Sequence, residues 1–243
     1  MESPASSQKY RPQAEQGLDS RPDMRHVRSW IFDLDNTLYR ADNGIFAQIE
    51  SRMTDYVSAF LDLPRDDARA RQKDLYRQYG TTLNGLMREH GCDAEDYLHF
   101  VHDIDLGDLA RDEALAFALE RLPGRRFVFT NGCRDHASRI LDRLGMTHLF
   151  DQVWDIRTMD FAPKPDIQAY ESVVASAGLA PPEAAMFDDI ARNLVPARAM
   201  GMTTVWLKTD APWGKHGPLM DVSEGDISHQ TEDLTQFLNS IRT

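Results

Sequence analysis

Five short apolar runs of strand length occur along this chain, and their arrangement constrains the fold more than any other sequence feature. The runs cover residues 29–32, 127–129, 153–156, 184–187 and 203–207. Each has the length and the aromatic or β-branched content of a buried strand. The sequence therefore predicts at least five buried strands, with a long interval between the first and the second.

Patterns typical of helices separate the last four runs. Residues 135–144 place apolar side chains at three-to-four spacing, and segments 166–177 and 191–200 also have the length of a helix. A glycine follows each segment, as is common at helix ends. Pro196 lies inside the third segment and predicts a kink or a later start of that helix. Strands that alternate with such helices predict an α/β fold with a parallel sheet covered on both faces.

The interval between the first two strands is roughly ninety residues long and is helical in pattern. Its first stripe of apolar side chains, at helical spacing, consists of Ile45, Phe46, Ile49, Met53, Tyr56, Val57 and Phe60. A crossover between parallel strands normally needs only one helix, so the interval predicts an inserted helical domain.

The domain organisation follows from these patterns. We expect a catalytic core formed by residues 29–40 and 111–207, and a helical domain formed by residues 41–110. Residues 1–28 are polar and predict a mostly disordered arm, without the apolar core of a signal sequence or the composition of a transit peptide. Residues 208–243 are acidic and predict one short helix near their end.

Composition excludes several classes of function. The net charge is −12, which disfavours a nucleic-acid partner, and no apolar run reaches the ~18 residues that a membrane span needs. Only two cysteines are present, and they match no disulfide framework or zinc-site spacing. A cytoplasmic location is therefore expected. An acidic chain binds an anionic ligand through a local group that offers positive charge or hydrogen-bond donors, such as a metal ion, a lysine or backbone N–H groups.

Carboxylates follow two of the predicted strands. Asp33 and Asp35 come directly after the first run, and Asp188 and Asp189 after the fourth, with Asn193 four residues further on. Taken singly, such residues are equally explained as solvated loop acids or helix caps. Together at strand ends, their hard oxygen atoms are ligands that suit Mg²⁺. The two pairs predict a magnesium site at one edge of the sheet.

Groups suited to phosphate follow the second strand. The Thr130 hydroxyl and the backbone N–H groups of Asn131 and Gly132 can bind phosphate oxygens without a net charge. Lys164 stands between two prolines, which makes it a candidate for a fixed cation. The alternatives are an ordinary strand-to-helix turn and a solvated loop lysine.

The order of these four groups resembles the haloacid dehalogenase (HAD) superfamily over residues 29–207. The resemblance implies a Rossmann-like core with an inserted helical cap domain, Mg²⁺ as cofactor and a phosphoaspartyl intermediate. It implies that Asp33 is the nucleophile and a metal ligand. It also implies that Asp35 is the general acid and base and ligates the metal through its backbone carbonyl. Thr130 and Lys164 would hold the phosphoryl group, and Asp188 would be the third metal ligand.

Relatives often carry a second acid shortly after the late acidic residue, and here the candidates for the outer ligand shell of the metal are Asp189 and Asn193. The acid at Asp35 argues against the dehalogenases of the superfamily, which lack it. The resemblance therefore implies a phosphomonoester hydrolase.

Four segments, residues 35–39, 79–87, 100–105 and 187–193, resemble the pyrimidine 5′-nucleotidase branch of that superfamily. The resemblance implies that UMP- or CMP-like monophosphates are hydrolysed to nucleoside and phosphate. Candidates for recognising the base are Tyr79, by stacking, and Asn84 and His102, by hydrogen bonding. Alternatively, these side chains belong to the core of the helical domain.

Two other functions remain open on the sequence. One is a phosphatase for another small metabolite, such as a sugar phosphate or pyridoxal phosphate. The other is a non-catalytic interaction protein that keeps the HAD fold. Four charged groups expected in one cleft (Asp33, Asp35, Lys164 and Asp188) have no packing purpose, which argues against the latter.

Overall fold

A six-stranded parallel sheet forms the centre of the computed structural model, which describes residues 21–107, 109–209 and 222–243. The strand order is β3-β2-β1-β4-β5-β6. The strands are β1 (Ser29–Phe32), β2 (Arg125–Phe129), β3 (Gln152–Trp154), β4 (Ala184–Asp188), β5 (Thr203–Leu207) and β6 (His229–Thr231). The predicted parallel α/β sheet is confirmed, and β6 is an additional edge strand that the apolar runs did not predict.

The central strand β1 is buried on both of its faces. It pairs with β2 and β4, so that Ile31 lies between Phe127 and Met186 in register. All four of its residues and all five residues of β4 are buried. The Phe32 and Phe187 rings stack across the two strands with centroids 4.6 Å apart. A strand in this position needs an uninterrupted apolar run, which is the pattern seen in the sequence.

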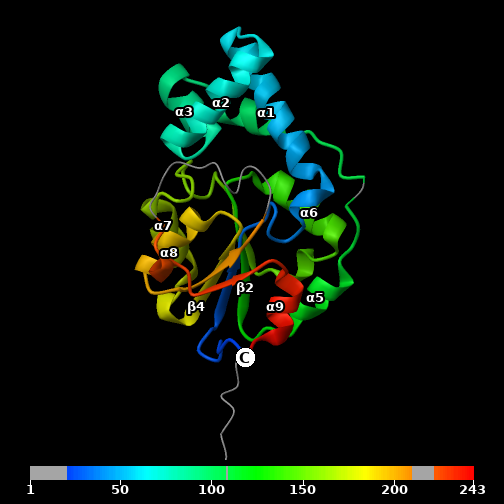
Figure 1. Ribbon diagram of the computed structural model, residues 1–243, viewed down its shortest axis with the longest axis vertical. Helices are drawn as coiled ribbons and strands as arrows, with labels where there is room; N and C mark the ends of the chain where they lie inside the picture. Colours follow the sequence, from blue (N-terminus) through cyan, green and yellow to red (C-terminus); the bar gives the residue numbers. More distant parts are fainter. Residues whose placement is uncertain (1–20, 108, 210–221) are drawn as a thin grey trace, which may run out of the picture.

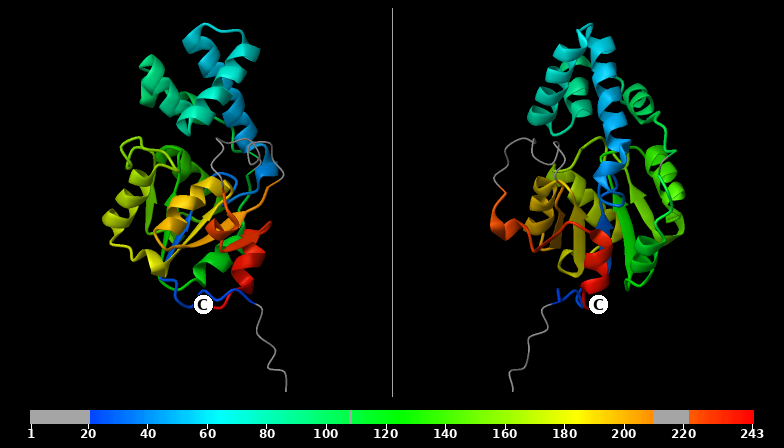
Figure 2. Two further views of the ribbon diagram at one scale, coloured as in Figure 1. Left: turned by 60° about the vertical axis from the view of Figure 1, so that its left-hand side comes forward. Right: turned by 45° about the vertical axis from the view of Figure 1, so that its right-hand side comes forward.

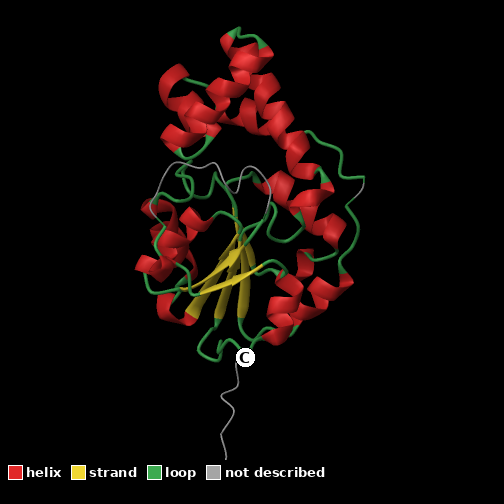
Figure 3. Cartoon of the chain, viewed as in Figure 1, coloured by secondary structure: helices red, strands yellow, loops and turns green. Residues whose placement is uncertain are grey.

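Helices cover both faces of the sheet, as Figures 1 and 3 show. Phe32, Phe187 and Val205 face one core, and Ile31 and Met186 face the other. The first core contains α5 (Glu113–Glu120), α6 (Arg134–Leu144) and α9 (Leu234–Ser240). The second core contains α7 (Ile167–Ala177) and α8 (Ala191–Ala199). The helix α8 starts at Ala191 despite Pro196, so the predicted later start is wrong.

Four further helices form a separate layer beyond the carboxyl ends of the strands (Figures 1 and 2). They are α1 (Ile45–Leu61), α2 (Arg65–Tyr79), α3 (Thr82–His90) and α4 (Ala94–His102). Their buried side chains include Val57, Leu75, Leu86, Tyr97 and Val101, which pack together. These helices occupy the segment that was expected to form the inserted helical domain, and we call them the helical layer. The helical layer therefore lies over the edge of the sheet at which the strands have their carboxyl ends.

The ordered core begins earlier than residue 29. Met24 and Val27 are fully buried, and the Met24 N–H donates to the Arg242 carbonyl oxygen at 2.9 Å. Residues 21–28 are therefore not part of a disordered arm, because two apolar side chains in this short stretch anchor it beside the end of the chain. The rest of the predicted arm, residues 1–20, lies outside the described residues, as do residues 210–221 of the acidic segment.

Among the helices of residues 21–107, 109–209 and 222–243, none is both long and apolar enough to cross a bilayer.

Candidate active site

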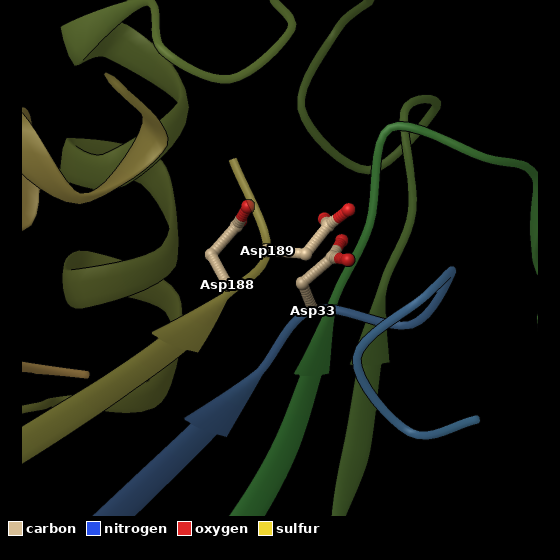
Figure 4. Close-up of side chains that lie close together, drawn as sticks. All are labelled: Asp33, Asp188 and Asp189. Carbon is tan, nitrogen blue, oxygen red and sulfur yellow. The ribbon is translucent and has the colours of Figure 1, made fainter. Parts of the chain in front are cut away.

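The acidic residues gather where the order of the strands changes direction. The chain adds β2 and β3 on one side of β1, and β4, β5 and β6 on the other. Such a switch point opens a crevice at the carboxyl ends of the two central strands, where α/β proteins bind ligands. Asp33 follows β1, Asp188 ends β4 and Asp189 follows it, and Figure 4 shows their carboxylates close together. One oxygen from each lies within 4.8 Å of the others.

Lys164 lies buried between two of these carboxylates. Its Nζ donates to Asp33 Oδ1 and Asp188 Oδ2, both at 2.7 Å, and to the Phe129 carbonyl oxygen at 2.8 Å. The three ammonium hydrogens are thereby all used. Burial lowers the pKa of Lys164, but the two carboxylates outweigh it and raise that pKa above its ordinary value. Lys164 is therefore a fixed cation at the switch point, in line with its position between prolines.

Asn131 holds the backbone of this lysine. Its Oδ1 accepts from the Lys164 N–H at 2.7 Å, and its Nδ2 donates to the Lys164 carbonyl oxygen at 3.1 Å. The nearby Gly132 N–H, which was expected to bind phosphate, donates instead to Thr130 Oγ1 at 2.9 Å. A threonine hydroxyl readily accepts from the N–H two residues on, which closes this short turn. In this structure the Gly132 N–H therefore bonds a group of its own turn, the Thr130 hydroxyl.

The carboxylates carry more negative charge than Lys164 balances. Burial raises the pKa of Asp33 to about 7; Lys164 opposes the shift, and the Asp188 and Asp35 carboxylates add to it. Burial and the Asp33 and Asp188 carboxylates also hold the pKa of Asp189 well above its usual range. Asp189 Oδ2 is buried, and no described residue bonds it. Buried oxygens with excess negative charge fit a hard divalent cation such as Mg²⁺.

Asn193 lies beside this cluster on α8. Its Nδ2 donates to Asp188 Oδ1 at 3.0 Å, and its Oδ1 is buried without a hydrogen-bond partner among the described residues. The Ile190 N–H also donates to Asp188 Oδ1, at 2.9 Å. These contacts fix the Asp188 carboxylate and leave an amide oxygen beside it.

Asp35 lies near the cluster but has its own partners. Its Oδ1 accepts from the Tyr39 hydroxyl at 2.6 Å and contacts His136 Nε2 at 2.7 Å. Burial raises the pKa of Asp35, but the His136 charge and the hydrogen bonds from His136 and Tyr39 outweigh it, and the pKa is about 2. Sequence reasoning missed both partners. Tyr39 lies four residues after Asp35, and His136 stands at a core-facing position of α6, so weak signals for both were present.

A cavity of about 240 Å³ separates the acidic cluster from the helical layer. From the sheet side it is lined by Asp33, Asp35, Thr130, Lys164, Asp189 and Asn193. From the helical layer it is lined by apolar and aromatic side chains, among them Phe46, Ile49, Met53, Tyr76 and Tyr97, and by polar ones, among them Glu50, Lys73, Arg77 and His102. The sheet side of the cleft is therefore charged, and the helical side combines apolar surface with a few polar groups, as small-molecule sites commonly do.

Of the three residues expected to recognise a base, the structure places one in the cleft and two outside it. His102 lines the cleft, whereas Tyr79 and Asn84 do not. The Tyr79 hydroxyl accepts from Gln78, and Asn84 donates to the Tyr79 carbonyl oxygen at 2.9 Å and accepts from Arg88. Asn84 is thus used to connect α2 with α3. Tyr76 and Tyr97 reach the cleft instead, and helical spacing alone did not distinguish them from core residues.

Comparisons with known proteins agree with this geometry. A family model described as haloacid dehalogenase-like hydrolase matches residues 27–201. Phosphate metabolism protein 8 of Saccharomyces cerevisiae is 29% identical over 189 residues, a match that covers 71% of this chain. The chain spans 59% of the length of that yeast relative.

Solved structures show the same fold. The HAD phosphatase from Thermococcus onnurineus has a TM-score of 0.56 at 17% identity, covering 89% of this chain and 100% of its own. The HAD hydrolase YfnB from Bacillus subtilis, in a magnesium-bound form, has a TM-score of 0.53 at 16% identity, covering 88% of this chain and 97% of its own. The family match extends over well more than half of the chain. This protein belongs to the haloacid dehalogenase-like hydrolase family.

Proposed function

We propose that the protein is a Mg²⁺-dependent phosphomonoester hydrolase that acts through a phosphoaspartyl intermediate on Asp33. The observation that carries the proposal is the buried group of Asp33, Asp188 and Lys164, joined by hydrogen bonds of 2.7 Å at the switch point of the sheet. The names of two similar proteins, a phosphate metabolism protein and a HAD phosphatase, support this chemistry.

The Asp33 and Asp188 carboxylates and the Asp35 backbone carbonyl would hold the magnesium ion, with Asp189 and Asn193 in its outer ligand shell. The carboxylates lie close enough together to share one ion. When bound, the ion supplies positive charge that neutralises the phosphoryl group during transfer. The magnesium-bound HAD hydrolase YfnB supports this choice of metal.

The side chains of the chain itself account for the two displacements. The Asp33 carboxylate attacks phosphorus, and the bond from phosphorus to the ester oxygen breaks while Asp35, which has to take up a proton when the anionic substrate binds, gives that proton to the ester oxygen. Water then attacks the phosphoryl group on Asp33 and gives a proton to the Asp35 carboxylate, which releases phosphate, frees the Asp33 carboxylate and returns Asp35 to its protonated form. The Thr130 hydroxyl holds a phosphoryl oxygen, and Lys164 does the same by exchanging one of its present hydrogen bonds when substrate binds. The Lys164 charge also reduces the repulsion between Asp33 and an anionic substrate.

We infer that the substrates are pyrimidine nucleoside monophosphates, such as UMP and CMP. The apolar and aromatic wall of the cleft, which includes Tyr76 and Tyr97, suits a planar base. The segments that resemble pyrimidine 5′-nucleotidases support the same class. Such substrates are cytoplasmic, and a reducing compartment is compatible with two buried free thiols, Cys92 and Cys133.

Phosphate release from a panel of monophosphates tests the proposal. With Mg²⁺ present, we expect kcat/KM for UMP and CMP to exceed that for AMP, GMP, glucose 6-phosphate and pyridoxal phosphate. Removal of the metal with EDTA abolishes turnover, and Asp33→Asn lowers it at least ~10²-fold because an amide is not a nucleophile. A wild type that prefers another phosphate contradicts the nucleotidase assignment. Activity that survives Asp33→Asn contradicts the covalent mechanism.

A further inference from the structure

We propose that His136, together with Tyr39, is a positioning residue that anchors one oxygen of Asp35 so that the other oxygen faces the substrate. This assignment rests on the phosphomonoester hydrolysis proposed above. Nothing in the four sequence motifs includes His136, which lies on α6, 101 residues from Asp35. The assignment gives a function to a buried imidazole that the mechanism otherwise leaves unused.

The two contacts converge on a single atom. The Tyr39 hydroxyl lies 2.6 Å and His136 Nε2 lies 2.7 Å from the same Oδ1 of Asp35. A carboxylate only accepts hydrogen bonds, so His136 carries a proton on Nε2. No described residue bonds Asp35 Oδ2, although Asp35 lines the cleft. One oxygen is held by two donors, and the other is available to a substrate.

His136 itself is held by packing rather than by further hydrogen bonds. Its side chain is fully buried, and its ring stacks on the His102 ring with centroids 4.4 Å apart and planes inclined by 17°. Its Nδ1 is buried and has no hydrogen-bond partner among the described residues. An unpaired buried nitrogen costs free energy, which a leucine at this position would avoid. Within the part of the chain that the structure describes, the contact with Asp35 is the one side-chain hydrogen bond of His136 that compensates for this cost.

The stacking partner belongs to the helical layer. His102 ends α4, its Nδ1 lies 2.9 Å from the Leu98 carbonyl oxygen, and Arg139 of α6 donates to the His102 carbonyl oxygen at 2.9 Å. These bonds hold the His102 ring against His136. The orientation of Asp35 therefore depends on how α4 is held against α6, and not only on the loop that follows β1.

A fixed carboxylate matters most when the leaving group needs a proton. Misplacing a reacting group by about 1 Å can cost on the order of 10²-fold in rate. Without the anchor, Asp35 Oδ2 would reach the ester oxygen less often, and esters with basic leaving groups would suffer most. Substrate binding depends on other residues, so KM would change little.

The test compares His136→Leu, which removes the donor at similar volume, with His136→Gln, whose side-chain amide restores an N–H. Each variant is assayed with Mg²⁺ on phenyl phosphate and on p-nitrophenyl phosphate, two esters of similar shape whose leaving groups differ in basicity. We expect His136→Leu to lower kcat on phenyl phosphate ~10- to 100-fold, with KM within about twofold, and to affect p-nitrophenyl phosphate clearly less. His136→Gln recovers most of that loss.

A second variant keeps the test decisive if His136→Leu does not fold, as thermal unfolding would reveal. Tyr39→Phe removes the other donor without changing the shape of the side chain, and it is expected to lower kcat in the same leaving-group-dependent way. Equal losses on both esters, a change in KM alone, or wild-type rates for both donor variants overturn the assignment. A wild type that hydrolyses neither ester overturns the proposed function instead, before any variant is compared.

Discussion

At the scale of single residues, the site is organised around one buried cation. The Lys164 ammonium donates hydrogen bonds to two carboxylates and a carbonyl oxygen, and the Lys164 backbone N–H donates to Asn131. The sequence predicted Lys164, Asp33 and Asp188 because each is a charged residue next to a strand end or between prolines. It did not predict the role of the Asn131 amide or the contact with His136, since both depend on contacts between segments far apart in the chain.

Removing this cation is expected to destabilise the fold more in the absence of magnesium than in its presence. Lys164→Met leaves Asp33 and Asp188 buried without their counter-charge, and breaking a buried ion pair typically costs about 3–5 kcal/mol. We expect a loss of this size in the free energy of unfolding in EDTA, and a partial recovery with Mg²⁺, because under the proposed function the metal would supply positive charge to the same carboxylates. Urea denaturation measures both.

The matched control for this experiment is Lys208→Met. Lys208 is exposed, and we expect its replacement to change stability by less than about 0.5 kcal/mol. A Lys164→Met variant as stable as the wild type in EDTA would show that the buried lysine is not needed to balance the carboxylates.

At the scale of elements, strand prediction succeeded where a strand is an apolar run and failed where it is polar. The apolar runs predicted β1 and β5 at their observed bounds, because burial on both faces of the sheet requires uninterrupted apolar residues. The edge strand β6 has only three residues, His229–Thr231, and no apolar run, so it carries no such signal. Its position comes from pairing with β5, which the sequence of β6 alone does not encode.

Close packing between two helices of the helical layer gives a prediction at this scale. A Cβ atom at Gly85 of α3 would lie 2.7 Å from Leu75 Cδ2 and 2.8 Å from Leu75 Cβ of α2. Gly85→Ala therefore forces α2 and α3 apart, and overpacking of this kind typically costs about 1–3 kcal/mol. We expect a lower thermal unfolding midpoint, measured by circular dichroism.

Gly225→Ala is the appropriate control, because the nearest atom to its added Cβ would be Ser223 Oγ at 3.7 Å, an ordinary contact distance. We expect that variant to unfold close to the wild-type temperature. If both alanine variants unfold together with the wild type, the α2–α3 contact is looser than the structure has it.

At the scale of the whole molecule, the two walls of the cleft come from different parts of the chain and suit different tasks. The carboxyl ends of the strands supply charged groups that suit chemistry common to all phosphate esters. The helical layer supplies apolar and aromatic groups, which suit the part of the substrate beyond the phosphate. The strand-end residues could be inferred from sequence because strands fix where their carboxyl ends lie. In the helical layer, His102 was inferred from sequence, whereas Tyr76 and Tyr97 were not, because apolar and aromatic residues at helical spacing there look like core.

Replacement of Tyr97 tests recognition by the helical layer separately from the chemistry at the strand ends. The Tyr97 hydroxyl is buried, has the Thr82 side chain as its neighbouring polar group, and belongs to a side chain that lines the cleft. If this hydroxyl bonds the base, Tyr97→Phe loses one hydrogen bond worth ~0.5–1.5 kcal/mol. We expect kcat/KM for UMP to fall roughly two- to tenfold, with little change for p-nitrophenyl phosphate, because the strand-end residues are untouched.

Tyr56→Phe provides the comparison for that measurement. Tyr56 packs edge-on against Tyr97 with centroids 5.0 Å apart, and its hydroxyl contacts Cys92 Sγ at 3.3 Å, away from the cleft lining. Tyr56→Phe removes a hydroxyl from the same aromatic cluster, so this variant controls for a general loosening of the helical layer. We expect the ratio of UMP to p-nitrophenyl phosphate activity in Tyr56→Phe to stay at the wild-type value. A ratio that falls equally in both variants would assign the effect to packing. A ratio unchanged in Tyr97→Phe would mean that the base is recognised elsewhere on the helical wall, with His102 the next residue to replace because it also lines the cleft.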